Sequence, residues 1–188
     1  MSNGSHHFSD QAIVTSILNG NIQRFAIVVK NTEKLVAQIV RKMISNENDQ
    51  KDLVQDIYLK AYQNLSSFQF KSKLSTWIAN IAYNTTVNYL QKKKIPIIEI
   101  EKTIEDKFTV SENPELETID AEALAILNAE ISKLPPLYKT LITLYHLEEL
   151  PNKEISEITN LPEGTIKSYL YRARKILKDN INHHYQHK

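Results

Sequence analysis

Cysteine is absent from the chain, which excludes disulfides, cysteine-based zinc sites and thiol chemistry together. Glycine and proline are scarce, with 3 and 6 residues among 188, so long low-complexity segments are not expected. No apolar run approaches the roughly 20 residues that cross a bilayer, and no basic flank with an apolar run opens the chain. We therefore expect a soluble protein of a reducing compartment, the cytoplasm.

Motifs of catalysis are missing as well. The sequence has no glycine-rich phosphate loop, and neither a Ser-His-Asp arrangement nor a metal-binding helix spacing stands out. Most histidines gather at the two ends, where a frayed tail or a cloning remnant explains them better than the alternative, a terminal metal site. His146 is expected at the surface. We therefore expect no enzyme, no cofactor, no metal and no small-molecule substrate.

Apolar residues recur every three or four positions through most of the chain, the spacing of amphipathic helices. Asn19-Gly20 is a helix stop signal, and Ser75 is placed to cap the helix that follows it. No segment alternates with period two for long enough to suggest a sheet. The pattern predicts an all-α protein with helices over about 10–17, 35–44, 53–65, 77–85, 124–134, 137–145, 151–159 and 165–178.

Charge divides the chain into two parts. Between Glu99 and Glu122, acidic residues outnumber lysines by 9 to 2, and apolar periodicity is weak. We interpret 95–117 as a flexible acidic linker, with an acidic surface on a folded piece as the alternative. The sequence thus predicts two small helical domains, 1–94 and 118–188. A net charge of +1 is compatible with nucleic-acid binding, because acids in one segment can balance a basic patch in another.

The second predicted domain carries a helix-turn-helix pattern. Two short helices flank the turn 160–164, where Asn160 tolerates left-handed geometry and Ser156 is small enough for a helix crossing. The second helix would expose basic and polar side chains opposite its apolar stripe, with further positive charge for phosphates. A generic helical hairpin with a solvated basic face is the alternative. The exposed set is Lys167, Ser168, Tyr171, Arg172, Arg174 and Lys175.

In the first predicted domain, aromatic residues alternate with lysines and asparagines over 68–94. Such a surface can hold an unpaired strand, because each stacked base contributes on the order of 1–3 kcal/mol, comparable with the cost of extracting it from a duplex. Trp77 falls on the apolar stripe and is expected in the core. The helix over 52–62 has one apolar and one polar face, and periodicity alone favours an ordinary amphipathic helix.

These segments resemble, in order and spacing, the extracytoplasmic-function (ECF) group of the sigma-70 family of RNA polymerase sigma factors. The resemblance runs from about Asp10 to Leu177. It rests on Asp52–Tyr62, Ser75-Thr76-Trp77, Ile81-Ala82, Asn84, Asn88-Tyr89-Leu90, Asn113-Pro114-Glu115, Leu134-Pro135-Pro136-Leu137, Leu150–Ile155, Leu161–Ser168 and Tyr171–Leu177.

The resemblance implies an alternative sigma factor that binds core RNA polymerase, recognises promoters and melts DNA. Lys167, Ser168, Tyr171 and Arg172 would read the minus-thirty-five element, and Arg174 and Lys175 would steady its backbone. The minus-ten strand would be met by Lys71, Ser72, Lys73, Asn80, Asn84 and Asn88. The clamp of the largest polymerase subunit would be met by Asp52, Gln55 and Asp56.

The implied partners are core RNA polymerase, through its clamp and its flap, promoter DNA and an anti-sigma factor. Two other classes remain open at this point. One is a stand-alone helix-turn-helix regulator with an N-terminal dimerisation or sensing domain, which would bind specific DNA without polymerase. The other is a protein-interaction adaptor with a vestigial DNA-binding domain, which would have no promoter activity.

Overall fold

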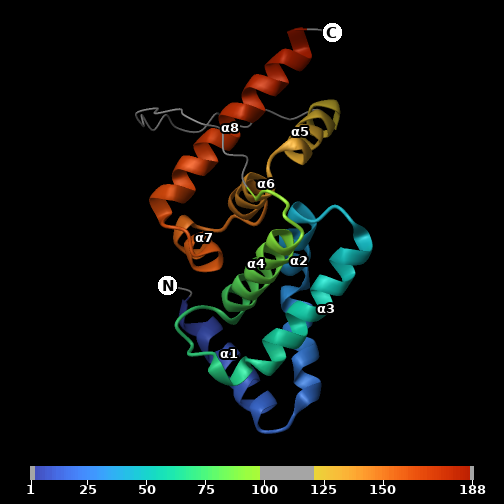
Figure 1. Cartoon of the computed structure of the whole chain (residues 1–188). Helices are drawn as coiled ribbons and strands as arrows, with labels where there is room; N and C mark the ends of the chain where they lie inside the picture. Colours follow the sequence, from blue (N-terminus) through green and yellow to red (C-terminus); the bar gives the residue numbers. More distant parts are fainter. Residues whose placement is uncertain (1–2, 98–120, 187–188) are drawn as a thin grey trace.

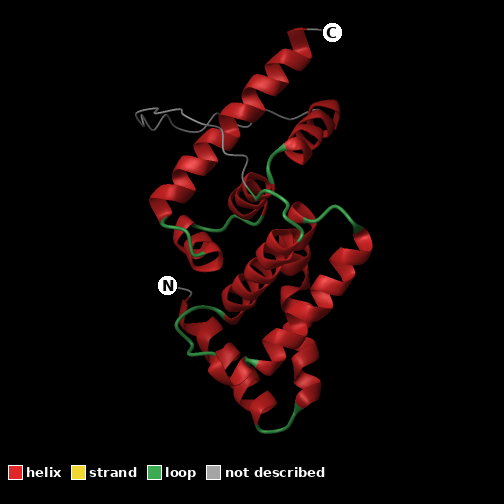
Figure 2. Cartoon of the chain, in the orientation of Figure 1, coloured by secondary structure: helices red, strands yellow, loops and turns green. Residues whose placement is uncertain are grey.

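The computed structural model describes residues 3–97 and 121–186. Within them every regular element is helical, as Figure 2 shows, so the all-α prediction is confirmed. The elements are α1 (Asn3–Leu18), η1 (Ile22–Arg24), α2 (Phe25–Met43), α3 (Glu47–Gln63), η2 (Leu65–Ser67), α4 (Leu74–Lys92), α5 (Ala121–Lys133), α6 (Pro136–Ile142), the π-helix η3 (Thr143–Leu147), α7 (Asn152–Thr159) and α8 (Glu163–Gln186).

The first half of the chain is a bundle in which α4 packs against both α2 and α3 (Figure 1). The apolar stripes that predicted these helices supply its core, including the fully buried Ile39, Ile57 and Ile78. Gly20 ends α1 with a φ of 100°, a conformation that costs glycine little. Asn46 caps α3 by accepting the backbone N–H groups of the second and third residues beyond it, at 2.9 and 3.0 Å.

The start of α4 differs from the sequence prediction. The helix begins at Leu74, so Ser75 lies inside its first turn and does not cap it. Lys73 occupies the capping position but offers no side-chain acceptor. Instead, Oδ2 of Asp10 in α1 accepts the backbone N–H of Leu74 at 2.9 Å. The cap therefore comes from a residue 64 positions away, which a local sequence pattern cannot reveal.

The second half of the chain is built around α8. Its predicted apolar stripe is buried as expected and packs on α6 and α7. The helix runs to Gln186, beyond the predicted end near residue 178, because no glycine or proline follows Gly164 to stop it. The added turns contact α5, where Oε2 of the buried Glu130 accepts the side-chain amide of Asn180 at 3.1 Å. The buried stripe of α8 ends at Leu177, and the half-buried Asn180 continues its contact with α5.

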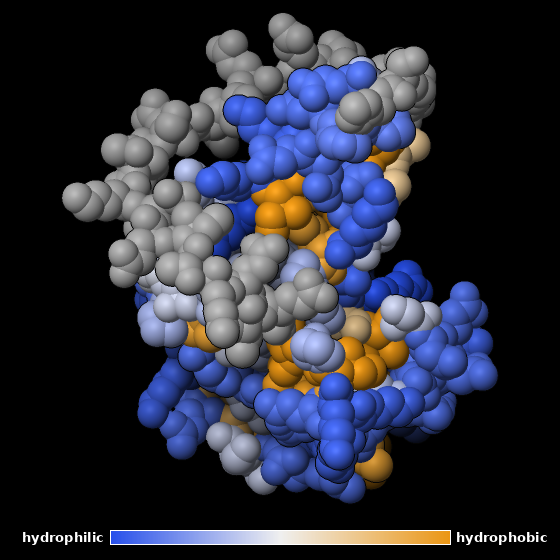
Figure 3. Space-filling model, turned by 45° about the horizontal axis from the view of Figure 1, so that its top comes forward, coloured by the Kyte–Doolittle hydropathy of each residue, from blue (hydrophilic) through white to orange (hydrophobic). Residues whose placement is uncertain are grey.

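The two halves are in direct contact. In Figure 1, α7 lies against α4, and α6 lies against α2. Backbone N–H of Leu137 donates to the carbonyl of Ile97 at 3.2 Å, and Lys34 pairs with Glu148 at 3.4 Å. On the face shown in Figure 3, the larger hydrophobic patches lie in the middle of the molecule, and hydrophilic surface dominates elsewhere. From residue 98 onward, the predicted linker 95–117 lies outside the described residues.

Candidate nucleic-acid interface

The turn between α7 and α8 has the geometry that its sequence predicts. Asn160 ends α7 in the left-handed conformation, with φ 58° and ψ 20°. Ser156 is half-buried, and its hydroxyl donates to the carbonyl of Leu161 at 2.6 Å, which ties the turn to α7. The two helices are therefore fixed relative to each other as a helix-turn-helix unit.

The basic face of α8 points away from its core. Ile166, Leu170, Ala173 and Leu177 are buried, so the residues between them take the opposite face. That face presents the whole predicted minus-thirty-five set, in which only Ser168 is half-buried and the others are exposed: Lys167, Ser168, Tyr171, Arg172, Arg174 and Lys175. The exposed His146 lies near this face. Partial desolvation lowers the pKa of His146, and the charge of Arg174 lowers it further.

The predicted minus-ten residues lie on one loop and one helix. Lys71 and Lys73 are exposed, and Ser72 between them is half-buried. A cavity of about 370 Å³ opens beside this loop, between α1, α2 and the start of α4. Its lining is mainly polar and includes Asp10, Asn31, Thr32, Lys73 and Ser75. The loop thus combines positive charge with an adjacent recess.

Three aromatic residues on either side of this loop in the sequence contact one another. Phe68 is buried and contacts Phe70 and Trp77, with ring centroids 4.7 and 5.3 Å apart. Trp77 is half-buried and packs against the core, which agrees in part with the prediction that it is a core residue. Phe70 has a φ of 56°, which is uncommon for an aromatic residue and marks a sharp change of chain direction before Lys71.

Along α4, the three predicted asparagines share one face but not one environment. Asn80 and Asn84 are half-buried, whereas Asn88 is exposed. The side-chain amide of Asn84 donates to Oδ1 of Asn80 at 3.0 Å. This bond directs the Asn80 amide group outward from α4, toward α7.

Residues of α7 meet the predicted minus-ten residues, a relationship that the sequence did not reveal. The Asn80 amide donates to the carbonyls of Glu157 and Ile158 at 3.0 and 2.9 Å. Glu154 accepts from Lys73 at 2.9 Å and from the Thr76 hydroxyl at 2.7 Å. Up to 81 residues separate these partners in the chain, so no local signal points to Glu154 or Thr76.

The same contact buries Tyr83 of α4. Burial raises the pKa of Tyr83 to about 12, and the charge of the neighbouring Tyr169 in α8 makes a smaller contribution in the same direction. The phenol is therefore held in its neutral form between the two halves. This makes Tyr83 a spectroscopic reporter of their contact.

The predicted polymerase-binding residues lie on the outer face of α3. Asp52 and Gln55 are exposed, and Asp56 is half-buried, with an ion pair of 2.7 Å to Lys60. Leu59 continues the same face one turn further and is 55% exposed. The face therefore joins polar groups to one accessible apolar side chain, a mixed surface suited to a protein partner.

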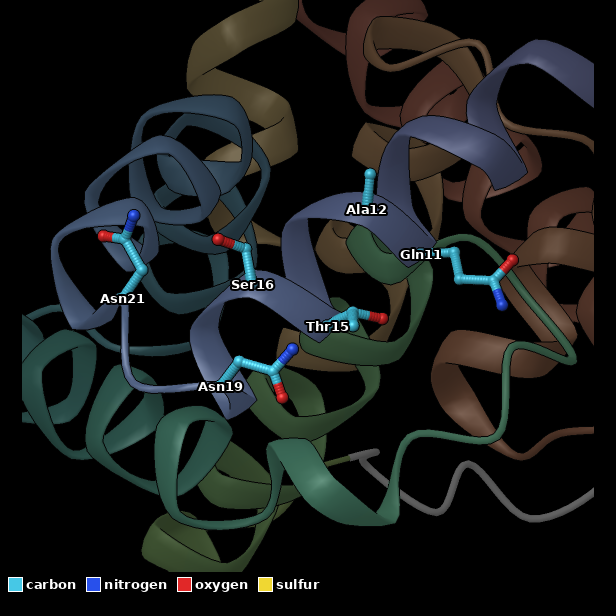
Figure 4. Close-up of a pocket in the computed structure, with 6 residues that line it drawn as sticks. All are labelled: Gln11, Ala12, Thr15, Ser16, Asn19 and Asn21. Atoms are coloured by element: carbon cyan, nitrogen blue, oxygen red, sulfur yellow. The ribbon is translucent and has the colours of Figure 1, made fainter.

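A second hollow lies away from the predicted site residues. Its volume is about 640 Å³. Figure 4 shows the residues that line it along and just after α1: Gln11, Ala12, Thr15, Ser16, Asn19 and Asn21. It contains no charged side chain and none of the predicted site residues. Across 3–97 and 121–186, no group of three or more His, Cys, Asp or Glu residues is arranged to hold a metal. Nor is any helix there long and apolar enough to cross a membrane.

Two family models match the chain. The model described as Sigma-70 region 2 matches 28–95, and the model described as Sigma-70, region 4 matches 124–177. The first spans the predicted polymerase-binding and minus-ten residues. The second spans the helix-turn-helix unit. A region 2 match in the N-terminal half removes the stand-alone regulator and the adaptor from consideration.

Full-length relatives agree with these matches. The ECF RNA polymerase sigma-E factor of Haemophilus influenzae is 33% identical over 94% of this chain and 97% of its own. The ECF RNA polymerase sigma factor SigW of Bacillus subtilis is 30% identical over 89% of this chain and 94% of its own.

Solved structures share the fold. CnrH, in complex with the cytosolic domain of CnrY, matches with a TM-score of 0.62 and 18% identity, over 92% of this chain and 97% of that chain. RpoE of Bartonella quintana, in complex with the anti-sigma factor NepR, matches with a TM-score of 0.61 and 20% identity, over 84% and 96%. The chain belongs to the ECF group of the sigma-70 family, the alternative sigma factors that bind core RNA polymerase and direct promoter recognition, DNA melting and transcription initiation.

Proposed function

We propose that this sigma factor divides promoter recognition between three surfaces. The basic face of α8 reads the minus-thirty-five duplex, the loop 71–73 with α4 captures the opened minus-ten strand, and the outer face of α3 binds the polymerase clamp. The corresponding division of the chain is 1–94, the linker 95–117 and 118–188. The observation that carries the proposal is the exposed basic face of α8 opposite its buried stripe.

For the duplex, Lys167, Ser168, Tyr171 and Arg172 are the proposed base readers. They begin four residues into α8, the part of a recognition helix that enters the major groove. Arg172 offers two parallel donors to a guanine edge, whereas Arg174 and Lys175 suit phosphate oxygens. The proposal thus separates residues that specify sequence from residues that add affinity.

For the opened strand, the proposed contacts are Lys71, Ser72, Lys73, Asn80, Asn84 and Asn88. The lysines neutralise phosphates, and the asparagine amides read base edges. The cavity beside Lys73 is large enough to receive an unstacked base, and its polar lining supplies hydrogen-bond partners. Strand capture of this kind helps to open DNA without ATP hydrolysis, so we assign the chain no catalytic step.

For protein partners, Asp52, Gln55 and Asp56 are proposed to bind the clamp, and the helix-turn-helix half to bind the flap. We also propose an anti-sigma partner, because RpoE of Bartonella quintana, which shares this fold, forms a complex with the anti-sigma factor NepR. The proposed site of action is the cytoplasm, where the polymerase lies.

The division of labour is testable by footprinting holoenzyme on one promoter. Lys71→Ala with Lys73→Ala is expected to reduce permanganate reactivity of thymines at the minus-ten element and to leave protection of the minus-thirty-five element unchanged. The double variant with Lys167→Ala and Arg172→Ala is expected to reduce protection of the minus-thirty-five element before it affects the minus-ten signal. If both double variants reduce the minus-ten reactivity and the minus-thirty-five protection equally, the separation of roles is wrong.

A further inference from the structure

Two side chains proposed to bind the minus-ten strand, those of Lys73 and Asn80, already have partners on α7. The clearer is Lys73, whose Nζ lies 2.9 Å from Oε2 of Glu154. The other oxygen of the same carboxylate, Oε1, accepts from the Thr76 hydroxyl at 2.7 Å. The Glu154 side chain is 12% exposed and that of Lys73 is 44% exposed, so the carboxylate is largely shielded from water and the ammonium group is not. Both oxygens of Glu154 are therefore committed to the first turn of α4.

Asn80 extends this contact by one turn of α4. Its amide donates to two carbonyls at the end of α7, which a helix end leaves without partners of its own. Asn84 fixes the direction of that amide through its bond to Oδ1 of Asn80. The face of α4 proposed for DNA is thus occupied by the first helix of the helix-turn-helix unit.

A carboxylate held this way has the chemistry of a nucleic-acid phosphate. Two anionic oxygens accept from one ammonium group and one hydroxyl, which are also common donors to phosphodiester oxygens. We propose that Lys73 and Thr76 form a phosphodiester-binding pair for the minus-ten strand and that Glu154 occupies this pair until DNA displaces it. This inference rests on the proposed function of α4 and adds Thr76 to its contacts.

The contact between the two halves also contains an opposing interaction. Burial lowers the pKa of Lys139 in α6. The positive charge of Lys42 in α2 lowers it further, so the two lysines lie near each other. Like charges brought together resist closure. The hydrogen bonds of Glu154 and Asn80 therefore lie in the same contact as one pair of like charges.

Competition of this kind lowers the apparent affinity of the free chain for a strand, because only the open fraction binds. It also couples the two promoter-binding halves, since α7 leaves α4 before the strand enters. Polymerase, which holds the two halves at separate promoter elements, would favour the open form. Free sigma factor would bind single strands weakly because α7 covers the strand-binding face of α4.

Glu154→Gln tests the pair directly in the full-length chain without polymerase. The probe is a fluorescein-labelled single-stranded DNA of mixed sequence, and binding is followed by anisotropy. Glu157→Gln is the matched control, because it removes the same charge from the same helix and its side chain is exposed. We expect Glu154→Gln to bind roughly tenfold more tightly than wild type and Glu157→Gln to stay within about twofold. Adding Lys73→Ala to Glu154→Gln should abolish the gain.

Equal gains from the two glutamine variants would attribute the effect to net charge and overturn the inference, as would no gain from either. The distance between the two halves is measured independently with spin labels attached at Ser67→Cys and Asp179→Cys. Labelling is specific to these two positions because the chain has no native cysteine. Wild type should give one narrow distance distribution, and Glu154→Gln a broader one at longer distance. Identical distributions would also overturn it.

The outcome is separable from that of the proposed function. If wild type initiates specific transcription with core polymerase but Glu154→Gln binds single strands as wild type does, only the role of Glu154 fails. If wild type yields no transcript and no complex with core, the function itself fails, whatever the strand-binding result.

Discussion

Asp10 of α1 accepts the backbone N–H of Leu74 at 2.9 Å and so caps α4, the helix proposed to hold the minus-ten strand. The first turn of that helix carries Thr76, and the residue before it is Lys73. The position of both donors therefore depends on a carboxylate from a different helix. Stability and strand binding should be linked through Asp10.

Asp10→Ala is expected to lower the free energy of unfolding by about 1 kcal/mol, the usual cost of losing a helix cap. It should also weaken single-strand binding, because the loop 71–73 loses its anchor. Asn46→Ala is the control, since it removes a comparable cap from α3. Urea unfolding should detect both variants, whereas strand binding should fall only for Asp10→Ala. Equal strand binding by both variants would contradict the link.

The helices could be predicted from sequence because their causes are local. The apolar stripe of α8, the left-handed Asn160 and the stop at Gly20 all follow from short patterns. The Asp10 cap and the Glu154 contact could not be predicted, because their partners lie 64 and 78 residues away. Periodicity shows that a helix has two faces but does not say which faces meet. The prediction of Ser75 as the cap failed for this reason.

Arg172→Ala should cost about 1–3 kcal/mol on the promoter whose base it reads and much less on a promoter already changed at that base pair. Lys178→Ala is the control on the same helix, as it is exposed but lies beyond the proposed readers. Holoenzyme binding to a series of single base-pair variants of the minus-thirty-five element gives both values. A uniform loss across the series would make Arg172 a phosphate contact and not a base reader.

Asp56→Arg should weaken binding to core polymerase by about tenfold or more, because it reverses a charge at the centre of the proposed interface. The folded chain should be little affected, since the Asp56 and Lys60 side chains are 46% and 43% exposed and ion pairs at the surface contribute about 0–1 kcal/mol. Glu33→Arg, an exposed position of α2, is the matched charge reversal. Competition for labelled core measures both, and unchanged affinity of Asp56→Arg would remove α3 from the interface.

Tyr83 predicts a specific dependence on alkaline pH. Its pKa is raised from 10.0 to about 12, so the folded state favours the neutral phenol. That contribution to stability is complete below pH 10 and is lost as pH rises toward 12. Tyr83→Phe lacks the ionisable group and should lose less stability over this window than wild type. The chain has nine tyrosines, so the difference in phenolate absorbance between wild type and Tyr83→Phe supplies the pKa of Tyr83. Parallel stability curves for the two proteins would contradict the assignment.

Transcription by purified core polymerase on fragmented DNA from the source organism tests the central claim most directly. With the chain added, we predict new transcripts with discrete starts and two shared sequence elements upstream of them. Absence of new transcripts, together with no complex between the chain and core in gel filtration, would contradict the account.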